Sequence, residues 1–287
     1  MKHGRWHRPI AAERCTTRGY TRSLWPARCG LVVGYRMGRK PHIPPLQGRV
    51  VVITRPAGTA AALARRVRAC GGTPLLLPGL SLRAADSPDM RAEMRAALQD
   101  DVLVFASPAA VRFAAALAPL RSRATVLAVG QGTAQALRGH GVPAQAPSRQ
   151  DSEGLLDLPA LRDLRGKRVA LIGAAGGRGL LREQLGARGA QLRELHVYQR
   201  VPPRLDRRHF AAVQALPRSA RVLLSSVEAL HNLLNLLPAL AGARLRAAVA
   251  VASSERLATA ARQAGFARIV LADSALAEDL LVASARR

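Results

Sequence analysis

Cysteines, aromatic residues and long apolar runs are all scarce in this sequence. Its three cysteines, Cys15, Cys29 and Cys70, do not have the spacing of a metal site, which argues against both zinc and a disulfide scaffold. Few cysteines also fit a reducing cytoplasm, where we expect the protein to reside. There is no run of about 18 uncharged apolar residues, so we expect no membrane span. No cluster of metal ligands stands out, and we predict no metal.

Acidic residues are scarce as well. The chain has 18 Asp and Glu against 44 Lys and Arg, for a net charge of +26. A basic surface attracts polyanions, which include nucleic acids and polycarboxylated or phosphorylated small molecules. The arginines are spread evenly and do not alternate with aromatic residues, which argues against a nucleic-acid-binding module. Arg-rich codon usage and solvated helix faces account for the charge equally well.

Residues 1–45 differ in composition from the rest of the chain. They contain ten Lys and Arg and one acidic residue, and they show no regular apolar period. They also lack the apolar core of a signal peptide. We interpret this segment as a disordered extension that an upstream start codon would create, with Met37 as the candidate native start. A transit peptide is the alternative.

From residue 46 onward, strand-like and helix-like patterns alternate. RVVVIT (49–54) and DVLVFA (101–106) are continuous apolar runs, typical of strands buried on both faces. Between them, apolar residues recur at helical spacing from Ala60 to Val67, and Gly71 follows as a helix stop. This alternation predicts an α/β fold with parallel sheets.

The second half of the chain repeats the first. Four segment pairs match in the same order, the first two at offsets of 118 and 119 residues. The pairs are LQGRVVVIT (46–54) with LRGKRVALIG (164–173), LVFASPAAV (103–111) with VLLSSVEAL (222–230), LAVGQGTAQALRGHGV (127–142) with AVASSERLATAARQAGF (250–266), and DSEGLLDL (151–158) with DSALAEDLL (273–281). We infer a duplicated α/β unit of about 120 residues, near the commonest domain size.

Candidate binding residues are those that directly follow the expected strands. Ligands of parallel sheets bind at the carboxyl ends of the strands, where helix N-termini offer backbone N–H groups to anions. The residues at these places are mostly small or hydroxylated: Arg55, Ser107, Gly130–Thr133, Gly173–Arg178, Ser225–Ser226 and Ser253–Arg256. Several such helix N-termini in one cleft would suit a ligand with many carboxylates or phosphates.

A set of short motifs resembles the uroporphyrinogen-III synthase family across residues 48–283. The motifs are TRP (54–56), FASPAAV (105–111), VGQGTA (129–134), a Gly-rich turn with Arg178, LHVYQR (195–200) and SSVEAL (225–230). Each one is a generic strand-turn-helix, so the resemblance depends on their order and spacing.

The resemblance implies two flavodoxin-like α/β domains joined by two extended linkers. One domain would be discontinuous, 46–79 plus 200–287, and the other would be 80–199. The repeat alone suggests a simple cut near residue 163. LRELHVYQRV (192–201) would form one linker, paired with the segment around Leu77–Leu82.

The resemblance also implies a reaction, the conversion of hydroxymethylbilane to uroporphyrinogen III. Water is lost, the last ring is inverted and the macrocycle closes, without a cofactor. The substrate carries eight carboxylates, which gives the basic charge a specific reason. Tyr198 matches the family tyrosine proposed to assist departure of the hydroxyl. A phenol near neutrality donates a hydrogen bond more readily than a whole proton. Packing of a linker strand is the alternative role for Tyr198.

The substrate-binding candidates follow from the same match. They are Arg55, Ser107, Gly130, Thr133, Gly173, Arg178, Ser226, Ser254 and Arg256. Ser107 and Ser226 are expected first as helix caps. The second copy has Ser254-Glu255-Arg256 in place of the common Gly-Pro-Thr type of turn, so a threonine role does not carry over there. Arg256 would bind a carboxylate, or pair with Glu255 or Glu278.

Two other classes of function stay open at this point. A non-catalytic two-domain α/β module that binds an anionic small molecule would share the architecture. A basic polyanion-binding protein would show steeply salt-dependent DNA binding. We expect a small-molecule polycarboxylate as partner, no nucleic acid, and a monomer.

Overall fold

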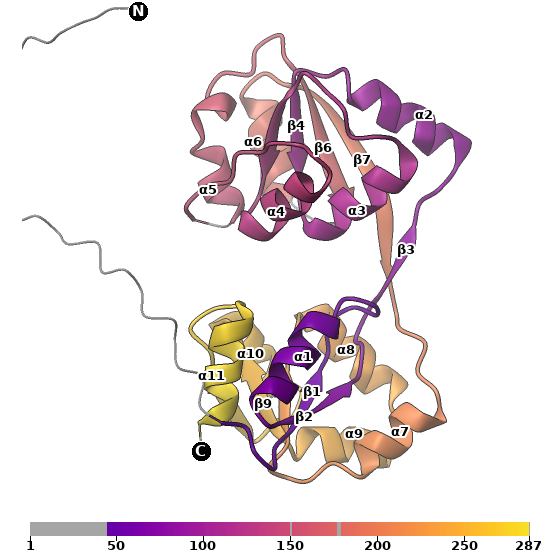
Figure 1. The fold of residues 1–287 in the computed structure, drawn as a ribbon, viewed down its shortest axis with the longest axis vertical. Coiled ribbons are helices and arrows are strands. Elements are labelled where there is room, and N and C mark those ends of the chain that lie inside the picture. The colour runs from indigo at the N-terminus through magenta and orange to yellow at the C-terminus, as the bar shows by residue number, and fades with distance from the viewer. Residues whose placement is uncertain (1–44, 150, 177–178, 287) are drawn as a thin grey trace, which may run out of the picture. The chain divides into compact units, whose positions relative to one another are not determined.

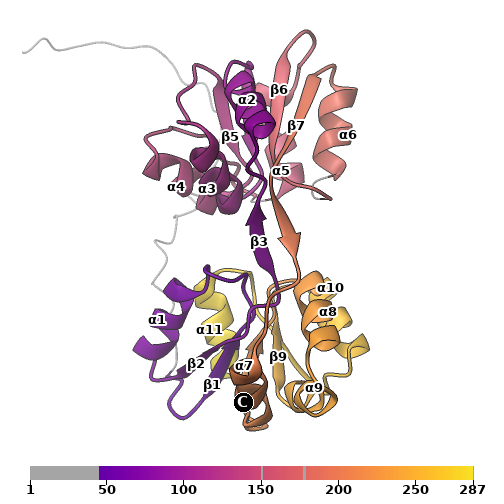
Figure 2. The same cartoon turned by 90° about the vertical axis from the view of Figure 1, so that its right-hand side faces the viewer.

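Two sheets organise the part of the chain that the structure describes. This computed structural model describes residues 45–149, 151–176 and 179–286. Within these ranges the chain forms eleven α-helices, one 3-10 helix (Pro159–Leu161) and ten strands in two five-stranded sheets (Figures 1 and 2). The expected α/β class is therefore confirmed. The expectations for a disordered extension and a start at Met37 concern residues 1–44, which lie outside the described ranges.

The first sheet is built from both ends of the chain and is parallel throughout. Its strands, in spatial order, are β10 (Arg268–Leu271), β9 (Val249–Ala252), β8 (Arg221–Leu223), β1 (Val50–Ile53) and β2 (Thr73–Leu76). Numbered along the chain, these strands lie in the order 2-1-3-4-5, which is the flavodoxin-like order.

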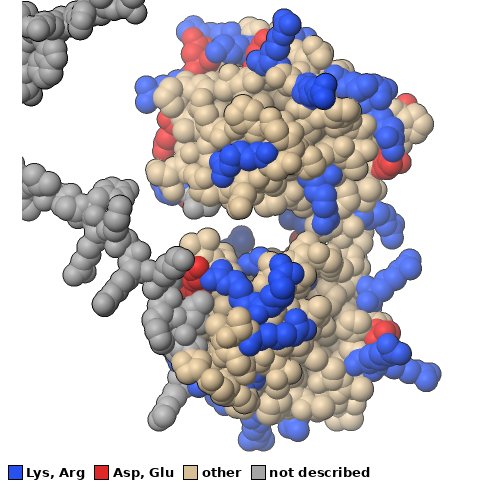
Figure 3. All heavy atoms as spheres, viewed as in Figure 1, with Lys and Arg blue, Asp and Glu red and all other residues tan. Residues whose placement is uncertain are grey.

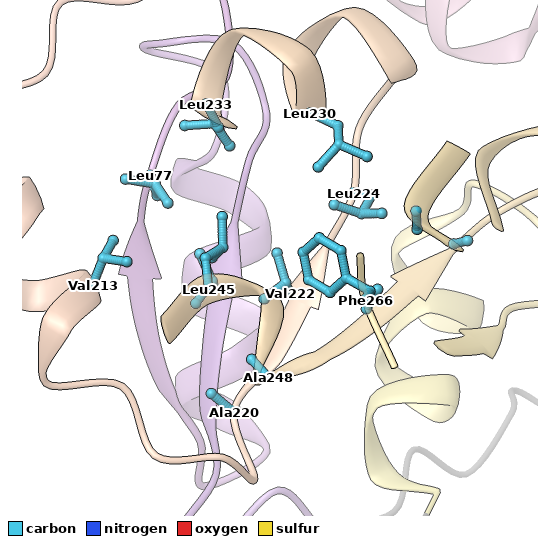
Figure 4. Packing of buried hydrophobic residues seen from close by; sticks show 14 of the residues in the cluster. Leu77, Val213, Ala220, Val222, Leu224, Leu230, Leu233, Leu245, Ala248 and Phe266 are labelled. Carbon is cyan, nitrogen blue, oxygen red and sulfur yellow. The ribbon is translucent and has the colours of Figure 1, made fainter. Parts of the chain in front are cut away.

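Helices cover both faces of the first sheet. Its helices are α1 (Ala61–Ala69), α7 (Arg207–Gln214), α8 (Val227–Leu236), α9 (Ala239–Arg246), α10 (Glu255–Gln263) and α11 (Ala277–Ala285). Successive side chains of a strand point to opposite faces. Val51 and Ile53 therefore pack with α1 and α11, whereas Val52 packs with α7 to α10. Figure 4 shows the second cluster, with Val222 of β8 among leucines of α8 and α9. Burial on both faces explains the continuous run RVVVIT.

The second sheet is formed by the middle of the chain. Its strands, in spatial order, are β3 (Ser81–Ala84), β7 (Gln191–Val201), β6 (Arg168–Ala174), β4 (Val102–Phe105) and β5 (Thr125–Ala128). The four strands β7, β6, β4 and β5 are parallel, and β3 is antiparallel to β7. The prediction of parallel sheets is thus right for nine of the ten strands described.

The second sheet is also covered on both faces. Its helices are α2 (Pro88–Ala97), α3 (Pro108–Leu117), α4 (Gln131–Gly139), α5 (Ser152–Leu156) and α6 (Gly179–Ala187). Leu103 and Phe105 of β4 pack with α2, α3 and α4, and Val102 and Val104 pack with α5 and α6. Helix α2 begins at Pro88 because the Ser87 hydroxyl accepts the Met90 N–H at 3.1 Å and proline is favoured in the first turn.

Strand β7 agrees with the strand expected at 192–201 to within one residue, and it has a second partner. It spans eleven residues, and its last four pair with β3, from Tyr198 opposite Ala84 to Val201 opposite Ser81. The two strands lie side by side in Figure 2. The expected partner segment, Leu77–Leu82, lies slightly too early in the chain. The pairing begins at Ser81 because residues before it are held by the first sheet, where Gly79 N–H donates to Thr54 O at 3.1 Å.

Gly79 fills a site where no side chain fits. A Cβ at this position would lie 2.5 Å from Cβ of Ala229 and 2.6 Å from its carbonyl oxygen. The Asn232 side-chain amide also donates to the Gly79 carbonyl at 3.1 Å. The chain thus leaves the first sheet in close contact with α8, and glycine is the residue that permits this approach.

We expect Gly79→Ala to lower the free energy of unfolding by about 1–3 kcal/mol, because α8 must shift to admit the methyl group. Urea unfolding followed by circular dichroism measures this change. Gly139→Ala is the matched control, since no heavy atom lies within 4 Å of its added Cβ. Equal free energies of unfolding for the two variants would contradict this expectation, because α8 would then move at no cost to admit the methyl group.

Candidate functional site

A cavity lies where the strand order of the second sheet reverses. Strands β4 and β6 are neighbours, but the chain goes on from β4 to β5 on one side and from β6 to β7 on the other. The carboxyl ends of two such strands flank the usual ligand site of an open α/β sheet. A cavity of about 160 Å³ occupies this place, lined by Ala106, Ser107, Leu171, Gly173, Ala174, Glu194, His196, Tyr198 and Arg200.

Two hydroxyl groups meet in this cavity. Ser107 Oγ and Tyr198 Oη lie 3.1 Å apart and are hydrogen-bonded. Ser107 also caps α3 by accepting the Ala110 N–H at 3.1 Å. The Tyr198 ring stacks on Phe113 of α3, with ring centroids 5.2 Å apart, and is 7% exposed. Only one of the two hydroxyl hydrogens is used within the pair, so the other can be donated to a bound ligand.

A β-bulge next to Tyr198 changes the direction in which the Tyr198 side chain points. Residues Gly173 and His196 are paired, yet the next residue of β6, Ala174, pairs with Tyr198, so that Val197 is the extra residue of a β-bulge. Bulges re-aim side chains and are common next to active sites. Gly173 itself leaves room, since a Cβ there would lie 3.2 Å from Cβ of Ala106.

Three charged or polar residues of the cavity were not among the sequence candidates. Glu194, His196 and Arg200 line it together with Tyr198. Glu194 and His196 precede the bulge at Val197, and Tyr198 and Arg200 follow it. The bulge breaks the alternation of the strand, so that Tyr198 packs in the same core cluster as Leu195 and Val197.

The first sheet has a cavity at the equivalent point. Its strand order reverses between β1 and β8. Beyond their ends lies a cavity of about 280 Å³, lined by Arg55, Pro56, Thr59, Leu63, Leu223, Leu224, Ser225, Ser253, Ala275 and Leu280. The strand ends are tied together, because Ser225 N–H donates to Thr54 Oγ1 at 3.0 Å and Ser225 Oγ–H donates to Thr54 O at 2.9 Å.

Arg55 is the charged residue of this second cavity. Burial of the guanidinium lowers its pKa below the ordinary value for arginine. Among the described residues, no carboxylate lies within ion-pair distance of Arg55. A partly desolvated cation without a counter-ion in the described ranges, beside the hydroxyl of Ser253, is an arrangement that suits an anionic ligand.

Some of the arginines that make the chain basic have structural roles and not a role in binding a ligand. Figure 3 shows Lys and Arg widely spread over the visible face, with few Asp or Glu. Several arginines bind backbone carbonyls instead of solvent. Arg188 donates to Leu156 O at 2.6 Å and to Leu161 O at 2.8 Å, and buried Arg221 donates to Ser284 O at 3.0 Å. Such arginines hold the ends of helices in place, so net charge alone overstates the binding surface.

Four other sequence candidates lie at helix starts outside the two cavities. Ser226 caps α8 by accepting the Ala229 N–H at 3.0 Å, and Ser254 caps α10 by accepting the Leu257 N–H at 3.3 Å. Gly130 precedes α4 as its cap residue. Thr133 is 4% exposed in the first turn of α4, which favours packing over ligand contact.

The two remaining candidates are arginines. Arg256 is exposed on α10, and the partners considered for it are taken by other residues. Glu255 lies 3.8 Å from Arg262, and Glu278 lies 2.7 Å from Arg66. The alternative of an Arg256 ion pair with either carboxylate is therefore wrong. Arg178 lies outside the described residues.

The described ranges contain neither a metal cluster nor a membrane-spanning helix. Within them there is no group of three or more His, Cys, Asp or Glu side chains that could hold a metal ion. None of the described helices is long and apolar enough to cross a membrane.

Known proteins share both the sequence and the fold. The family model for uroporphyrinogen-III synthase HemD matches residues 61–282. Uroporphyrinogen-III synthase of Salmonella typhimurium is 35% identical over 80% of this chain and 98% of its own, and that of Escherichia coli is 33% identical over the same shares.

Solved structures of the same enzyme resemble this fold. A mutant uroporphyrinogen III synthase from Thermus thermophilus has a TM-score of 0.51 at 22% identity, covering 81% of this chain and 96% of that one. The Helicobacter pylori enzyme has a TM-score of 0.52 at 16% identity over the same shares. At these identities the likeness shows the fold alone, and the family follows from the sequence matches. The chain belongs to the uroporphyrinogen-III synthase family.

Proposed function

We propose that this chain carries out its family's reaction at the cavity between β4, β6 and β7, and that Tyr198 is the group that acts on the leaving hydroxyl. The reaction is the closure of hydroxymethylbilane to uroporphyrinogen III, with loss of water and inversion of the last ring. It makes the chain a lyase of tetrapyrrole synthesis. Family membership disfavours the alternative of a non-catalytic binding module.

The hydrogen-bonded hydroxyls of Ser107 and Tyr198 carry this proposal. They are 3.1 Å apart at the topological switch point of a parallel sheet, and one hydroxyl hydrogen is left to donate. The cavity volume of about 160 Å³ is below the 300–1,000 Å³ that is usual for a drug-sized ligand. It therefore suits the reacting end of a linear tetrapyrrole and not the whole molecule.

The proposed reaction needs only a hydrogen-bond donor and a fixed substrate orientation from such a site. A pyrrole nitrogen lone pair expels the hydroxyl, so the C–O bond breaks and an azafulvene forms. A hydroxyl donor stabilises the departing oxygen, which leaves as water after taking up a proton. The azafulvene carbon then bonds to the substituted α-carbon of the last ring, which gives a spiro intermediate. The old bond between that carbon and its methylene bridge breaks, and a second azafulvene forms. The freed methylene carbon bonds to the unsubstituted α-carbon of the last ring, which loses its proton. Orientation contributes to such reactions up to about 7–11 kcal/mol in ideal cases.

We propose the cavity of the first sheet as a site for a substrate carboxylate. Arg55 is its cation, and the Ser253 hydroxyl is a further donor, whereas the Ser225 hydroxyl already donates to Thr54 O. The N-termini of α8 and α10, capped by Ser226 and Ser254, and that of α4 after Gly130 offer backbone N–H groups to other carboxylates. The other three candidates have smaller roles in this proposal. Thr133 packs in the core, Gly173 leaves space in the Tyr198 cavity, and Arg256 is an exposed cation on α10.

We infer that the two sheets are duplicated domains, with 46–79 plus 200–287 as one and 80–199 as the other. In spatial order, β2-β1-β8-β9 of the first sheet match β7-β6-β4-β5 of the second, as the sequence repeat requires. The isolated bridge of Leu127 with Gln145 stands where β10 lies in the first sheet. Strands β3 and β7 would be the linkers. Both cavities form within one chain, which supports a monomer as the functional unit.

The deciding experiment is incubation with freshly prepared hydroxymethylbilane, followed by oxidation and separation of the porphyrin isomers. We expect the type III isomer to predominate. It should form well above the rate of spontaneous closure, because otherwise uncatalysed closure to the type I isomer would consume the substrate first. Heat-denatured protein is the control. Type I product alone, at the spontaneous rate, would exclude the proposed activity.

A further inference from the structure

Arg200 stands at the edge of the Tyr198 cavity, and the sequence motifs assigned it no role. It lines the cavity two residues after Tyr198 on β7. Its side chain is 36% exposed, so the guanidinium is reachable by a ligand from solvent. Among the described residues it is the arginine of this cavity, where Glu194 is already close to Arg182, at 3.8 Å.

The contacts of Arg200 are few and long. Its Nε lies 3.3 Å from Glu228 Oε2, and its Nη2 donates to Ala175 O at 3.4 Å. Charge-assisted hydrogen bonds between N⁺–H and O⁻ are normally about 2.7–2.9 Å long. A guanidinium has five N–H donors. In the described part of the chain, Arg200 therefore keeps most of its binding capacity unused.

Glu228 is a weak competitor for this arginine. Its side chain is 44% exposed, and it lies in the first turn of α8, where the helix dipole stabilises a carboxylate without any partner. An exposed ion pair of this kind is easily exchanged. An incoming carboxylate that meets the planar guanidinium with both oxygens makes two short bonds in place of one long one.

We propose that Arg200 binds a carboxylate of the tetrapyrrole substrate, and that Glu228 holds the guanidinium at the cavity edge until the substrate displaces it. This inference rests on the proposed function, because it assigns a substrate group to the same cavity. Arg200 then positions the reacting end of the substrate against the hydroxyls of Tyr198 and Ser107. Glu228 acts against binding, since substrate must break the pair.

The test is equilibrium binding of uroporphyrin III, the oxidised octacarboxylate form of the product, measured by its own fluorescence at fixed ionic strength. We expect Arg200→Gln to raise Kd about tenfold, as for the loss of a hydrogen-bonded charge pair. Glu228→Gln should lower Kd about two- to fivefold, because it removes the competing carboxylate. Arg91→Gln is the control, since Arg91 lies on α2 in a similarly exposed pair with Asp86 and outside both cavities; its Kd should stay within twofold of wild type.

A purely structural Arg200–Glu228 pair makes the opposite prediction for Glu228→Gln. Arg200→Gln and Glu228→Gln would then weaken binding alike, and the charge-swapped variant Arg200→Glu/Glu228→Arg would restore it. Either that pattern or an unchanged Kd for Arg200→Gln overturns the role of Arg200. An unchanged Kd for Glu228→Gln overturns the competition. Unfolding midpoints equal to wild type confirm that the variants are folded.

The same proteins separate this inference from the proposed function. With hydroxymethylbilane, Arg200→Gln should raise KM about tenfold and change kcat less than threefold, because Arg200 binds the substrate in its ground and transition states alike. If wild type yields only type I product, the proposed activity fails, and porphyrin binding still decides whether Arg200 recognises a carboxylate.

Discussion

Tyr198→Phe should lower kcat about a hundredfold while leaving KM nearly unchanged. Removing one donor that acts on developing oxygen charge costs about 10²–10³ in kcat in other enzymes. The phenyl ring can still stack on Phe113, so the substitution deletes the hydroxyl and little else. Initial rates of type III formation measure the effect, with type I product rising as the slowed enzyme loses to spontaneous closure.

Two serine variants show whether a fall in activity reflects the hydroxyl pair or the helix cap. Ser107 and Ser87 each cap a helix that has proline in its first turn, and each accepts the N–H three residues on at 3.1 Å. Either change to Ala should cost about 1 kcal/mol of stability. Only Ser107→Ala should also lower kcat, because only Ser107 contacts Tyr198. Full activity in Tyr198→Phe would assign Tyr198 to packing alone.

Arg55→Met should raise KM for hydroxymethylbilane about tenfold to a hundredfold and should not destabilise the protein. Loss of a hydrogen-bonded charge pair with a substrate carboxylate explains the weaker binding. Burial of the cation lowers the pKa of Arg55, so the folded chain holds this charge at a cost. Methionine keeps the unbranched apolar stem of the side chain without the charge, and the free energy of unfolding should stay equal or rise.

Arg65→Met is the matched control for Arg55. Arg65 lies exposed on α1, outside the lining of both cavities, and loses the same charge. It should change neither KM by more than about twofold nor stability by more than about 0.5 kcal/mol. Equal KM for the two variants would mean that Arg55 contributes only to the general field of the protein. A large loss of stability in Arg55→Met would instead make Arg55 a structural residue.

The strands could be predicted because each carries its own pattern. RVVVIT and DVLVFA each contain at least four consecutive apolar residues, a pattern typical of a strand that is buried on both faces of a covered sheet. Helix starts at Ser107 and Ser226 were readable for a similar reason, since a cap is a contact over three residues. The partner of β7 was expected around Leu77–Leu82 from the family resemblance alone, a few residues before the observed β3, because the pairing joins residues more than a hundred positions apart.

The candidate site was only half predictable. Tyr198, Ser107 and Gly173 were expected from strand ends and a family resemblance, and they line one cavity. Their mutual distances could not be predicted, because the contact of Ser107 with Tyr198 spans 91 residues of sequence. The same limit explains why Arg200 was missed and why Thr133, equally placed after a strand, proved buried.

The sequence by itself therefore determined the α/β class, the repeat, the family and the strand ends at which a ligand is expected, because periodicity and motif order are local properties of the chain. Tertiary structure was needed to bring β4 next to β6 and β1 next to β8, and so to choose two of several strand ends as cavities. Tertiary structure also decided which group each arginine contacts. Arg200 has a weak and exchangeable partner, Arg55 has none among the described residues, and Arg188 is held by carbonyls. Those differences arise from packing between distant segments, which no short stretch of sequence encodes.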